Sequence, residues 1–396
     1  MQWFLSRRKL KTLCRIFCKC ALVITTLVLF VLYYIDNDRS FWPIPHFGLI
    51  SHTEGPYVQT FPERQFGPNR QNKVILIWSK YFQTYEWVEA IKKHTTHCNV
   101  QCEVTNDRNK LLNSDAILFH FTDKDLFSYD LPPQRLLHQV WAIYINEPNI
   151  FVQEGFTRWK NVFNWTVSYR RHSTVFTPYG MFQPNVNASR INPSIYPATN
   201  RDKMAYAVIS RCAEDAERYT IVDEISKYIE VDYFGACGNL KCEIKANSCL
   251  SPKNLRRYKF RLAFEDSNCR DYVTEKYWDT LANGIIPVVN WKEAQRNVPV
   301  PPHSFINVYD FKDIKSLTDY LLKVSKDRLL FESYFKWTQH YKIYTTFWNS
   351  FCNFCIALNN ESIPSQVYTD LEGWIRDDYC ERFTVSIIYN DICFHL

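Results

Sequence analysis

The segment that ends in Tyr272-Val-Thr-Glu-Lys276 carries the densest set of chemically capable side chains in the sequence. Thr274 suits the N-cap of a helix, so the pattern predicts a helix that begins at Glu275. The free N–H groups and the positive dipole end of such a helix suit a diphosphate. Lys276 adds a full positive charge for a leaving phosphate, and Glu275 can accept hydrogen bonds from sugar or ribose hydroxyls. The segment favours a sugar-nucleotide site, but it also fits an ordinary capped, solvated first turn.

Strands are predicted on both sides of this helix, over Phe260 to Phe264 and over Ile285 to Val289. Gly284 provides the helix stop between them. In open α/β sheets, ligands bind at the carboxyl ends of the strands. The loop that leads into the helix lies in that position.

Short apolar runs alternate with helical patterns along most of the chain, which indicates parallel, doubly wound sheets. One series begins at Val74 and a second at Met204, with the linker signals Asn192-Pro193 and Tyr196-Pro197 between them. The predicted division is a cytosolic tail (1–19), a transmembrane anchor (20–35), a stem (36–72), an N-terminal α/β domain (73–195), a C-terminal α/β domain (196–358) and a C-terminal extension (359–396). An extended arm packed on the domain is an equally good interpretation of the stem.

Charge is concentrated at the N-terminus. The chain has a formal net charge of +6, and residues 1–19 hold six basic residues and no acidic one, so the rest of the chain sums to zero. A nucleic-acid-binding protein would need a basic excess in its folded part. The composition therefore excludes nucleic acid as a partner.

Cys20 to Ile35 is an uncharged, Leu/Val/Ile-rich run that directly follows this basic tail. It is short for a membrane span, but it reaches bilayer thickness if Lys19 snorkels, and the basic flank then stays cytosolic. A cleaved signal peptide is the alternative. No small-x-small cleavage pattern follows Ile35, so an uncleaved anchor is expected.

Of the fourteen cysteines, eleven lie beyond the predicted anchor, a density that fits an oxidising lumen. By spacing alone, Cys98, Cys102, Cys352 and Cys355 could form a zinc site or two disulfides, and a lumenal compartment favours disulfides. Sequons for N-glycosylation occur at three positions, Asn164, Asn187 and Asn360.

The run Phe264-Glu-Asp-Ser, then Asp271-Tyr-Val-Thr-Glu-Lys, then Gly284-Ile-Ile-Pro-Val-Val closely resembles the signature of the α1,3-fucosyltransferases. Further stretches match in the same order, among them Asn164-Trp-Thr-Val-Ser-Tyr-Arg170, Pro178-Tyr-Gly180, Val231-Asp-Tyr-Phe-Gly-Ala-Cys-Gly238, Ser333-Tyr-Phe-Lys-Trp337 and Phe351-Cys-Asn-Phe-Cys355. The resemblance spans about residues 73 to 358, and ordered matches are far more specific than any one of them.

The resemblance implies a GT-B fold of two Rossmann-like domains that face a cleft, inverting transfer from GDP-β-L-fucose, and a single-pass type II Golgi topology with a lumenal catalytic domain. It implies that the C-terminal domain binds the donor through Tyr272, Glu275 and Lys276, with Arg218 on the phosphates. Glu265 and Asp266 of the same signature are also expected at the donor. No cofactor is then required, and a divalent cation such as Mn²⁺ is at most stimulatory.

Inversion in one step needs a base for the acceptor hydroxyl and an electrophilic clamp on the departing GDP. Glu147 is the expected base. It follows a predicted strand, Val140 to Ile145, and resembles the family's Glu-x-Pro turn, where Pro148 helps to hold the carboxylate. The resemblance also implies disulfides that join the early pair Cys98/Cys102 to the late pair Cys352/Cys355.

The sequence departs from the family pattern at a few positions. Asp266 stands where Asn is usual, Asp215 where a second Arg is frequent, Asn290 in a turn that usually contains Gly, and His172 begins a run that is usually acidic. These departures keep open a catalytically silent lumenal binding module.

A metal-dependent GT-A transferase is the other alternative. Its Asp-x-Asp would be Asp123-Lys-Asp125, which follows a predicted strand but lies far from the donor-like motif. No metal is expected there, and His120 is expected to be a packed or acceptor-side residue.

The Cys-rich stretches look more like those of invertebrate or core-type family members. We therefore expect the acceptor to be a GlcNAc residue of a glycoprotein N-glycan, with LacNAc or LacdiNAc antennae as alternatives.

Overall fold

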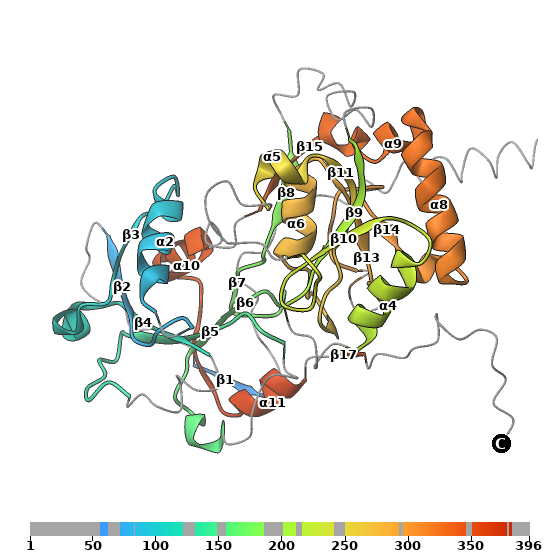
Figure 1. Cartoon of the computed structure of the whole chain (residues 1–396). Helices are drawn as coiled ribbons and strands as arrows, with labels where there is room; N and C mark the ends of the chain where they lie inside the picture. The colour runs from blue at the N-terminus through green and yellow to red at the C-terminus, as the bar shows by residue number, and fades with distance from the viewer. Residues whose placement is uncertain are drawn as a thin grey trace, which may run out of the picture. The chain divides into compact units, whose positions relative to one another are not determined.

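The computed structural model describes residues 56–61, 72–82, 84–121, 131–148, 156–185, 201–210, 216–240, 250–292, 295, 297–345, 351–377 and 380–381 (Figure 1). All of them belong to the compact unit Leu49–Leu396. The tail and the anchor expected over 1–35 lie outside the described residues. Within the described residues, no helix is both long and apolar enough to cross a membrane.

The N-terminal half is built on a six-stranded sheet in the order β3-β2-β4-β5-β6-β7, and each pair of neighbouring strands is parallel (Figure 1). Its elements are β2 (Lys73–Ile77), α2 (Glu86–Thr95), β3 (Cys102–Thr105), η1 (Arg108–Asn113), β4 (Ala116–His120), β5 (Val140–Ile145), η3 (Phe156–Trp159), β6 (Trp165–Ser168) and β7 (Val175–Phe176). The prediction of a parallel sheet is confirmed for this half.

The strands of this sheet are apolar on both faces, as strands covered on both sides must be. Ile75 and Ile77 point to one face, where Trp87 of α2 is buried, whereas Leu76 points to the other face, where Trp374 lies. The two-residue period of a strand therefore divides one apolar run between two cores.

The C-terminal half is built on a five-stranded parallel sheet in the order β10-β9-β11-β13-β14. Its elements are β9 (Lys203–Val208), α4 (Ala216–Ser226), β10 (Val231–Phe234), α5 (Pro252–Leu255), β11 (Tyr258–Leu262), β12 (Asn268–Cys269), α6 (Glu275–Ala282), β13 (Ile286–Val289), β14 (Ile306–Asn307), η6 (Val308–Asp310), α8 (Ile314–Lys326), α9 (Arg328–Ser333) and η7 (Lys336–Gln339). The strands predicted over Phe260–Phe264 and Ile285–Val289 and the helix predicted from Glu275 lie within two residues of β11, β13 and α6.

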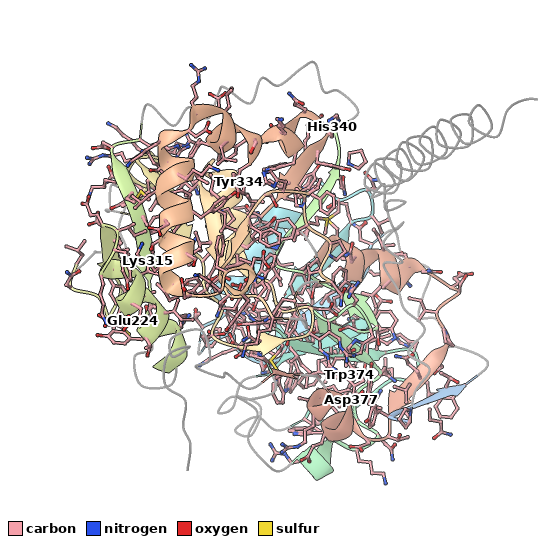
Figure 2. All side chains as sticks on the ribbon, turned by 90° about the vertical axis from the view of Figure 1, so that its right-hand side faces the viewer. Glu224, Lys315, Tyr334, His340, Trp374 and Asp377 are labelled. Carbon is pink, nitrogen blue, oxygen red and sulfur yellow. A yellow bond between two sulfur atoms is a disulfide. The ribbon has the colours of Figure 1, made fainter. Side chains whose placement is uncertain are left out.

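Helices α4 and α8 cover one face of this sheet and lie side by side, as the labels on Glu224 and Lys315 show in Figure 2. Ile225 of α4 and Leu321 of α8 are fully buried there against Phe260 of β11. Asp313 caps α8, because its carboxylate accepts from the Ser316 backbone N–H at 2.7 Å. Helix α6 contributes to a different core, described below.

The chain returns to the N-terminal sheet after the C-terminal one. Helix α10 (Phe351–Asn359) packs against one face of the N-terminal sheet. Helix α11 (Leu371–Arg376) packs against the other face of the same sheet. Strand β16 (Ser365–Tyr368) pairs antiparallel with β1 (Val58–Phe61). Part of the expected stem and part of the expected extension thus complete the N-terminal half, so for Val58–Phe61 the structure shows the packed-arm alternative.

Two further antiparallel pairs join distant segments. Strand β8 (Met181–Pro184) pairs with β15 (Tyr341–Tyr344), and β12 pairs with β17 (Cys380–Glu381). Both pairings connect residues more than a hundred positions apart, which local sequence pattern does not specify.

Three disulfides tie these returning segments down. Cys98 bonds to Cys352 and Cys102 to Cys355, the arrangement that the family resemblance implied, and Cys269 bonds to Cys380. Cys269 and Cys380 are 111 residues apart in the sequence. In the chain-entropy model, a disulfide that closes a loop of this size stabilises the folded state by about 5 kcal/mol.

The sequons differ in their surroundings. The Asn164 amide joins three segments, because its oxygen accepts from Arg135 and from the Trp141 backbone N–H (2.9 Å) and its nitrogen donates to the Gln366 carbonyl (2.7 Å). This position serves the fold, which argues against Asn164 as a glycosylation site. Asn360 lies in an exposed turn after α10, and Asn187 lies outside the described residues.

Candidate active site

The Tyr272–Lys276 segment forms the predicted capped helix start. Thr274 has extended backbone angles, and its hydroxyl accepts from the Lys276 backbone N–H at 3.3 Å, so α6 begins at Glu275. The segment follows β11 at the carboxyl edge of the C-terminal sheet. Both sequence expectations, the cap and the sheet edge, are confirmed.

Glu265 is fully buried beneath this helix start. Its carboxylate accepts from the Thr274 backbone N–H at 2.8 Å, from the Thr274 hydroxyl at 2.9 Å and from Lys276 Nζ at 3.0 Å. Burial raises the pKa of the Glu265 carboxyl, and the charge of Lys276 opposes this. The carboxylate expected at the donor thus holds the cap and the lysine.

Lys276 is held as a charged side chain of which 16% is exposed. Burial alone would lower its pKa, but the carboxylates of Glu265, Glu275 and Asp266 outweigh burial and raise it. Its Nζ also donates to the Thr274 hydroxyl at 3.0 Å. A full positive charge is therefore fixed in the first turn of α6.

Asn290, a departure from the family pattern, has a clear structural contact. Its side-chain oxygen accepts from the Glu265 backbone N–H at 2.8 Å, and its nitrogen donates to the Glu265 carbonyl at 3.0 Å. The fully buried amide therefore satisfies both backbone groups of Glu265. Asn290 fixes the end of β11 against the end of β13.

Asp266 directly follows Glu265, whose backbone Asn290 holds. One of its carboxylate oxygens is buried without a hydrogen-bond partner, in the part of the chain that the structure describes. Its negative charge acts on Lys276 and on Tyr272. Asp266, another departure from the family pattern, thus adds negative charge near Lys276.

Arg218 reaches the same edge from α4. The side chain is buried, and Nη1 donates to the Phe264 carbonyl at 3.4 Å, directly before Glu265. Two cations, Arg218 and Lys276, therefore contact the segment Phe264–Glu265 that follows β11. Asp215 lies outside the described residues.

Glu147 follows β5 at the carboxyl edge of the N-terminal sheet and is half-buried. Tyr179 donates its phenolic proton to the backbone carbonyl of Asn146, the residue before Glu147. The Tyr179 ring meets Tyr272 edge to face, with 6.1 Å between ring centroids. A pair of buried tyrosines thus connects the expected base with the donor motif.

The charge of Glu147 acts on these phenols. Burial raises the pKa of Tyr179 and Tyr272 well above the usual range, and Glu147 raises both further. Glu275 also acts on Tyr179. These phenols are neutral hydrogen-bonding groups, and the two acidic residues share one electrostatic neighbourhood.

Gly180 allows this close approach. A Cβ at Gly180 would lie 2.2 Å from Cγ of Trp278 on α6, well inside contact distance. Tyr169, Tyr179, Tyr272 and Trp278 belong to one buried cluster. The Pro178-Tyr-Gly180 match therefore has a packing reason.

Sequence reasoning missed one contact between the halves. Asp271, with a positive φ of 63°, accepts from the Arg171 backbone N–H at 3.0 Å and from Arg171 Nε at 2.8 Å. Arg171 follows one matched motif and Asp271 begins another, but no local signal pairs positions a hundred residues apart. The ion pair fixes the backbone directly before Tyr272.

His120 is completely buried at the end of β4. Its Nε2 lies 3.2 Å from the side-chain oxygen of Asn146, and burial lowers the pKa of His120 to about 4. The described residues contain no group of three or more potential metal ligands. Asp123 and Asp125 lie outside them.

Two family models match this chain. The model described as "Fucosyltransferase, N-terminal" matches residues 70–180, and "Glycosyltransferase family 10 (fucosyltransferase) C-term" matches residues 198–374. The chain is 30% identical to "Alpha-(1,3)-fucosyltransferase C" of Drosophila melanogaster, over 77% of this chain and 78% of that protein. It is 33% identical to "Alpha-(1,3)-fucosyltransferase 7" of Mus musculus, over 76% of this chain and 75% of that protein.

This chain belongs to the family 10 fucosyltransferases. The first family match covers the strands of the N-terminal sheet. The second covers the C-terminal sheet and runs on to α11. Among solved structures, an alpha1,3-fucosyltransferase with GDP-fucose is similar at a TM-score of 0.44 and 15% identity, over 77% of this chain and 95% of that one.

Proposed function

We propose that this fucosyltransferase transfers L-fucose from GDP-β-L-fucose, with inversion and in α1,3 linkage, to a GlcNAc residue of a glycoprotein N-glycan. The observation that carries the proposal is the Tyr179–Tyr272 contact, which connects the Glu147 turn to a charged, capped helix start. The names of the relatives support the α1,3 linkage and the transfer of fucose.

On the donor side, Arg218, Lys276 and the positive dipole end of α6 would bind the diphosphate. Tyr272 and Glu275 would contact the sugar and ribose. Glu265 would act indirectly, since its carboxylate already accepts from Thr274 and Lys276. The fixed positive charges would stabilise GDP as it departs.

On the acceptor side, Glu147 would remove the proton of the acceptor hydroxyl. The hydroxyl oxygen forms a bond to the anomeric carbon of fucose as the bond from that carbon to the β-phosphate oxygen breaks. The attack from the opposite face inverts the configuration, the proton remains on Glu147 and the electron pair leaves with GDP. Arg218 and Lys276 would stabilise the negative charge of the departing GDP, so no metal ion is required in this scheme, and Mn²⁺ would at most stimulate.

The two sheets support a GT-B arrangement, in which donor and acceptor bind to different halves. We further propose a Golgi membrane location with type II topology. The basic tail and the apolar run Cys20 to Ile35 support it, as do the disulfides Cys98–Cys352, Cys102–Cys355 and Cys269–Cys380.

The test is a transfer assay with the full chain in detergent, labelled GDP-fucose and an acceptor panel of core N-glycan, LacNAc and LacdiNAc, followed by linkage analysis. Transfer to GlcNAc of the core glycan in α1,3 linkage is expected. Transfer to the antennae alone would move the acceptor. GDP-fucose binding without transfer or hydrolysis would favour the catalytically silent lumenal module. The departure at Asp266, whose carboxylate has one buried oxygen without a hydrogen-bond partner among the described residues, keeps this alternative open.

A further inference from the structure

Phe82 occupies a backbone conformation that an aromatic residue rarely adopts. It lies in a tight turn closed by two hydrogen bonds, from the Tyr81 N–H to the Thr84 carbonyl (2.9 Å) and from the Thr84 N–H to the Tyr81 carbonyl (3.0 Å). Its φ is +43°, in the left-handed region that favours Gly and Asn. A bulky residue at this position is strained, and such strain concentrates at functional sites.

The Phe82 side chain is also half exposed, at 50%. Within the described residues, the other non-glycine positions with positive φ are Asn161, Asp271 and His303, so Phe82 is the large apolar one. A strained backbone and an exposed aromatic ring both disfavour Phe on grounds of stability alone. The combination calls for a contact with something outside the fold.

The ring lies close to the expected base. Phe82 meets Tyr81 edge to face with 4.6 Å between centroids, and His120 with 5.5 Å. The Tyr81 hydroxyl accepts from the Asn146 side-chain nitrogen at 3.0 Å, and Glu147 follows Asn146. Phe82 therefore adjoins a buried network that ends at the Glu147 turn.

Electrostatics place the same network near the donor motif. Burial raises the pKa of Tyr81, and the charges of Glu147 and Glu275 both raise it further. The hydrogen bond from Asn146 places Tyr81 beside the residue that precedes the expected base. An aromatic surface beside it borders the place where a sugar acceptor would meet the donor.

We propose that Phe82 binds the acceptor, with its ring against the apolar C–H face of a pyranose whose hydroxyl is directed to Glu147. This inference deepens the proposed function and rests on it for the identity of the acceptor. A β-linked GlcNAc suits the ring, because its ring hydrogens are axial and form apolar faces.

Steady-state kinetics on the full chain test the proposal, with Phe82→Ala, Phe82→Tyr and Phe82→Asn. Loss of the ring is expected to raise the acceptor KM about ten-fold, the scale of one aromatic contact, with the GDP-fucose KM changed less than two-fold. Phe82→Tyr should restore the acceptor KM. Phe61→Ala, which removes a 41% exposed ring from β1, is the matched control and should change neither constant.

For Phe82→Asn, the melting temperature and the acceptor affinity should not fall together. Asn tolerates positive φ, so Phe82→Asn is expected to melt no lower than the wild type while its acceptor KM rises. If Phe82→Ala and Phe82→Asn both melt several degrees lower and keep the wild-type acceptor KM, the ring is only a cover for His120 and the proposal is wrong.

Glycan binding without donor separates this proposal from the proposed function. Saturation-transfer NMR with N,N′-diacetylchitobiose should show contact with the wild-type chain and Phe82→Tyr, and lose it in Phe82→Ala. A wild type that binds the disaccharide through Phe82 but transfers no fucose would refute the function and keep this inference. Equal binding by Phe82→Ala would refute the inference, whatever the transfer activity.

Discussion

The donor and acceptor sides of the site are built in different ways. On the donor side, Glu265, Thr274 and Lys276 bind one another within twelve residues of sequence. On the acceptor side, Glu147 depends on Tyr179 and on a network through Asn146 to Tyr81, which comes from a separate turn. A local motif fixes the first, and tertiary packing fixes the second.

Substitutions on the two sides should therefore have different effects on stability and on activity. A change within the donor motif leaves a buried group without its partner and should lower both stability and donor binding. A substitution at Glu147 removes the expected base from a half-buried position and should leave the fold intact.

The largest effect is expected for Glu147→Gln. Removal of the base should lower kcat by about 10³-fold or more, within the range for general-base loss, with GDP binding and melting temperature unchanged. Single-turnover transfer and calorimetric GDP titration measure the two parts. Glu89→Gln on the exposed face of α2 is the control, and transfer near wild type in Glu147→Gln would assign the base elsewhere.

Lys276→Met should be the most damaging change to stability. It leaves the fully buried Glu265 carboxylate without its cation, at a cost of about 3–5 kcal/mol in the free energy of unfolding. Denaturant unfolding measures it. Lys315→Met, at an exposed ion pair on α8, is the matched control and should change little.

The pH dependence of Lys276→Met has a definite sign. Burial already raises the pKa of the Glu265 carboxyl, and loss of the lysine raises it further. The carboxyl takes up a proton more readily in the folded state, so the destabilisation should be larger at pH 8 than at pH 5. An equal loss at both pH values would mean that Glu265 is not the group affected.

Asn290→Ala should have a smaller effect. It leaves the buried N–H and carbonyl of Glu265 unpaired, which costs about 2–3 kcal/mol and should also weaken GDP binding as the strand end relaxes. Thermal unfolding and GDP titration measure both effects. The exposed Asn109→Ala serves as control, and a wild-type melting temperature for Asn290→Ala would refute the anchoring role.

The smallest effect is expected for Arg171→Met, which tests the contact between the two halves. The Arg171 side chain is 43% exposed, so its ion pair with Asp271 should be worth only about 1 kcal/mol. Because Asp271 precedes Tyr272, the GDP-fucose KM should rise about three-fold. Arg257→Met, at an exposed pair with Asp202, is the control, and equal KM values for the two variants would remove any role at the donor.

The sequence predicted several elements that carry local signals, whereas the amphipathic helix α8 with its Asp313 cap was not predicted. Strand Val140–Ile145 was placed to the residue, and the Thr274 cap and the parallel sheets were correct. These features depend on a two-residue apolar period, on buried runs and on side chains that bond within one turn. The ordered motif matches supplied the family.

Only the tertiary structure decided how distant segments meet. The return of α10 and α11 to the N-terminal sheet, the Arg171–Asp271 pair and the Asn290 contact with Glu265 join residues that no local pattern relates. Asn290 and Glu265 were singled out in the sequence, but as a departure and as a donor contact. A sequence states which side chains are available, whereas packing decides which of them become partners.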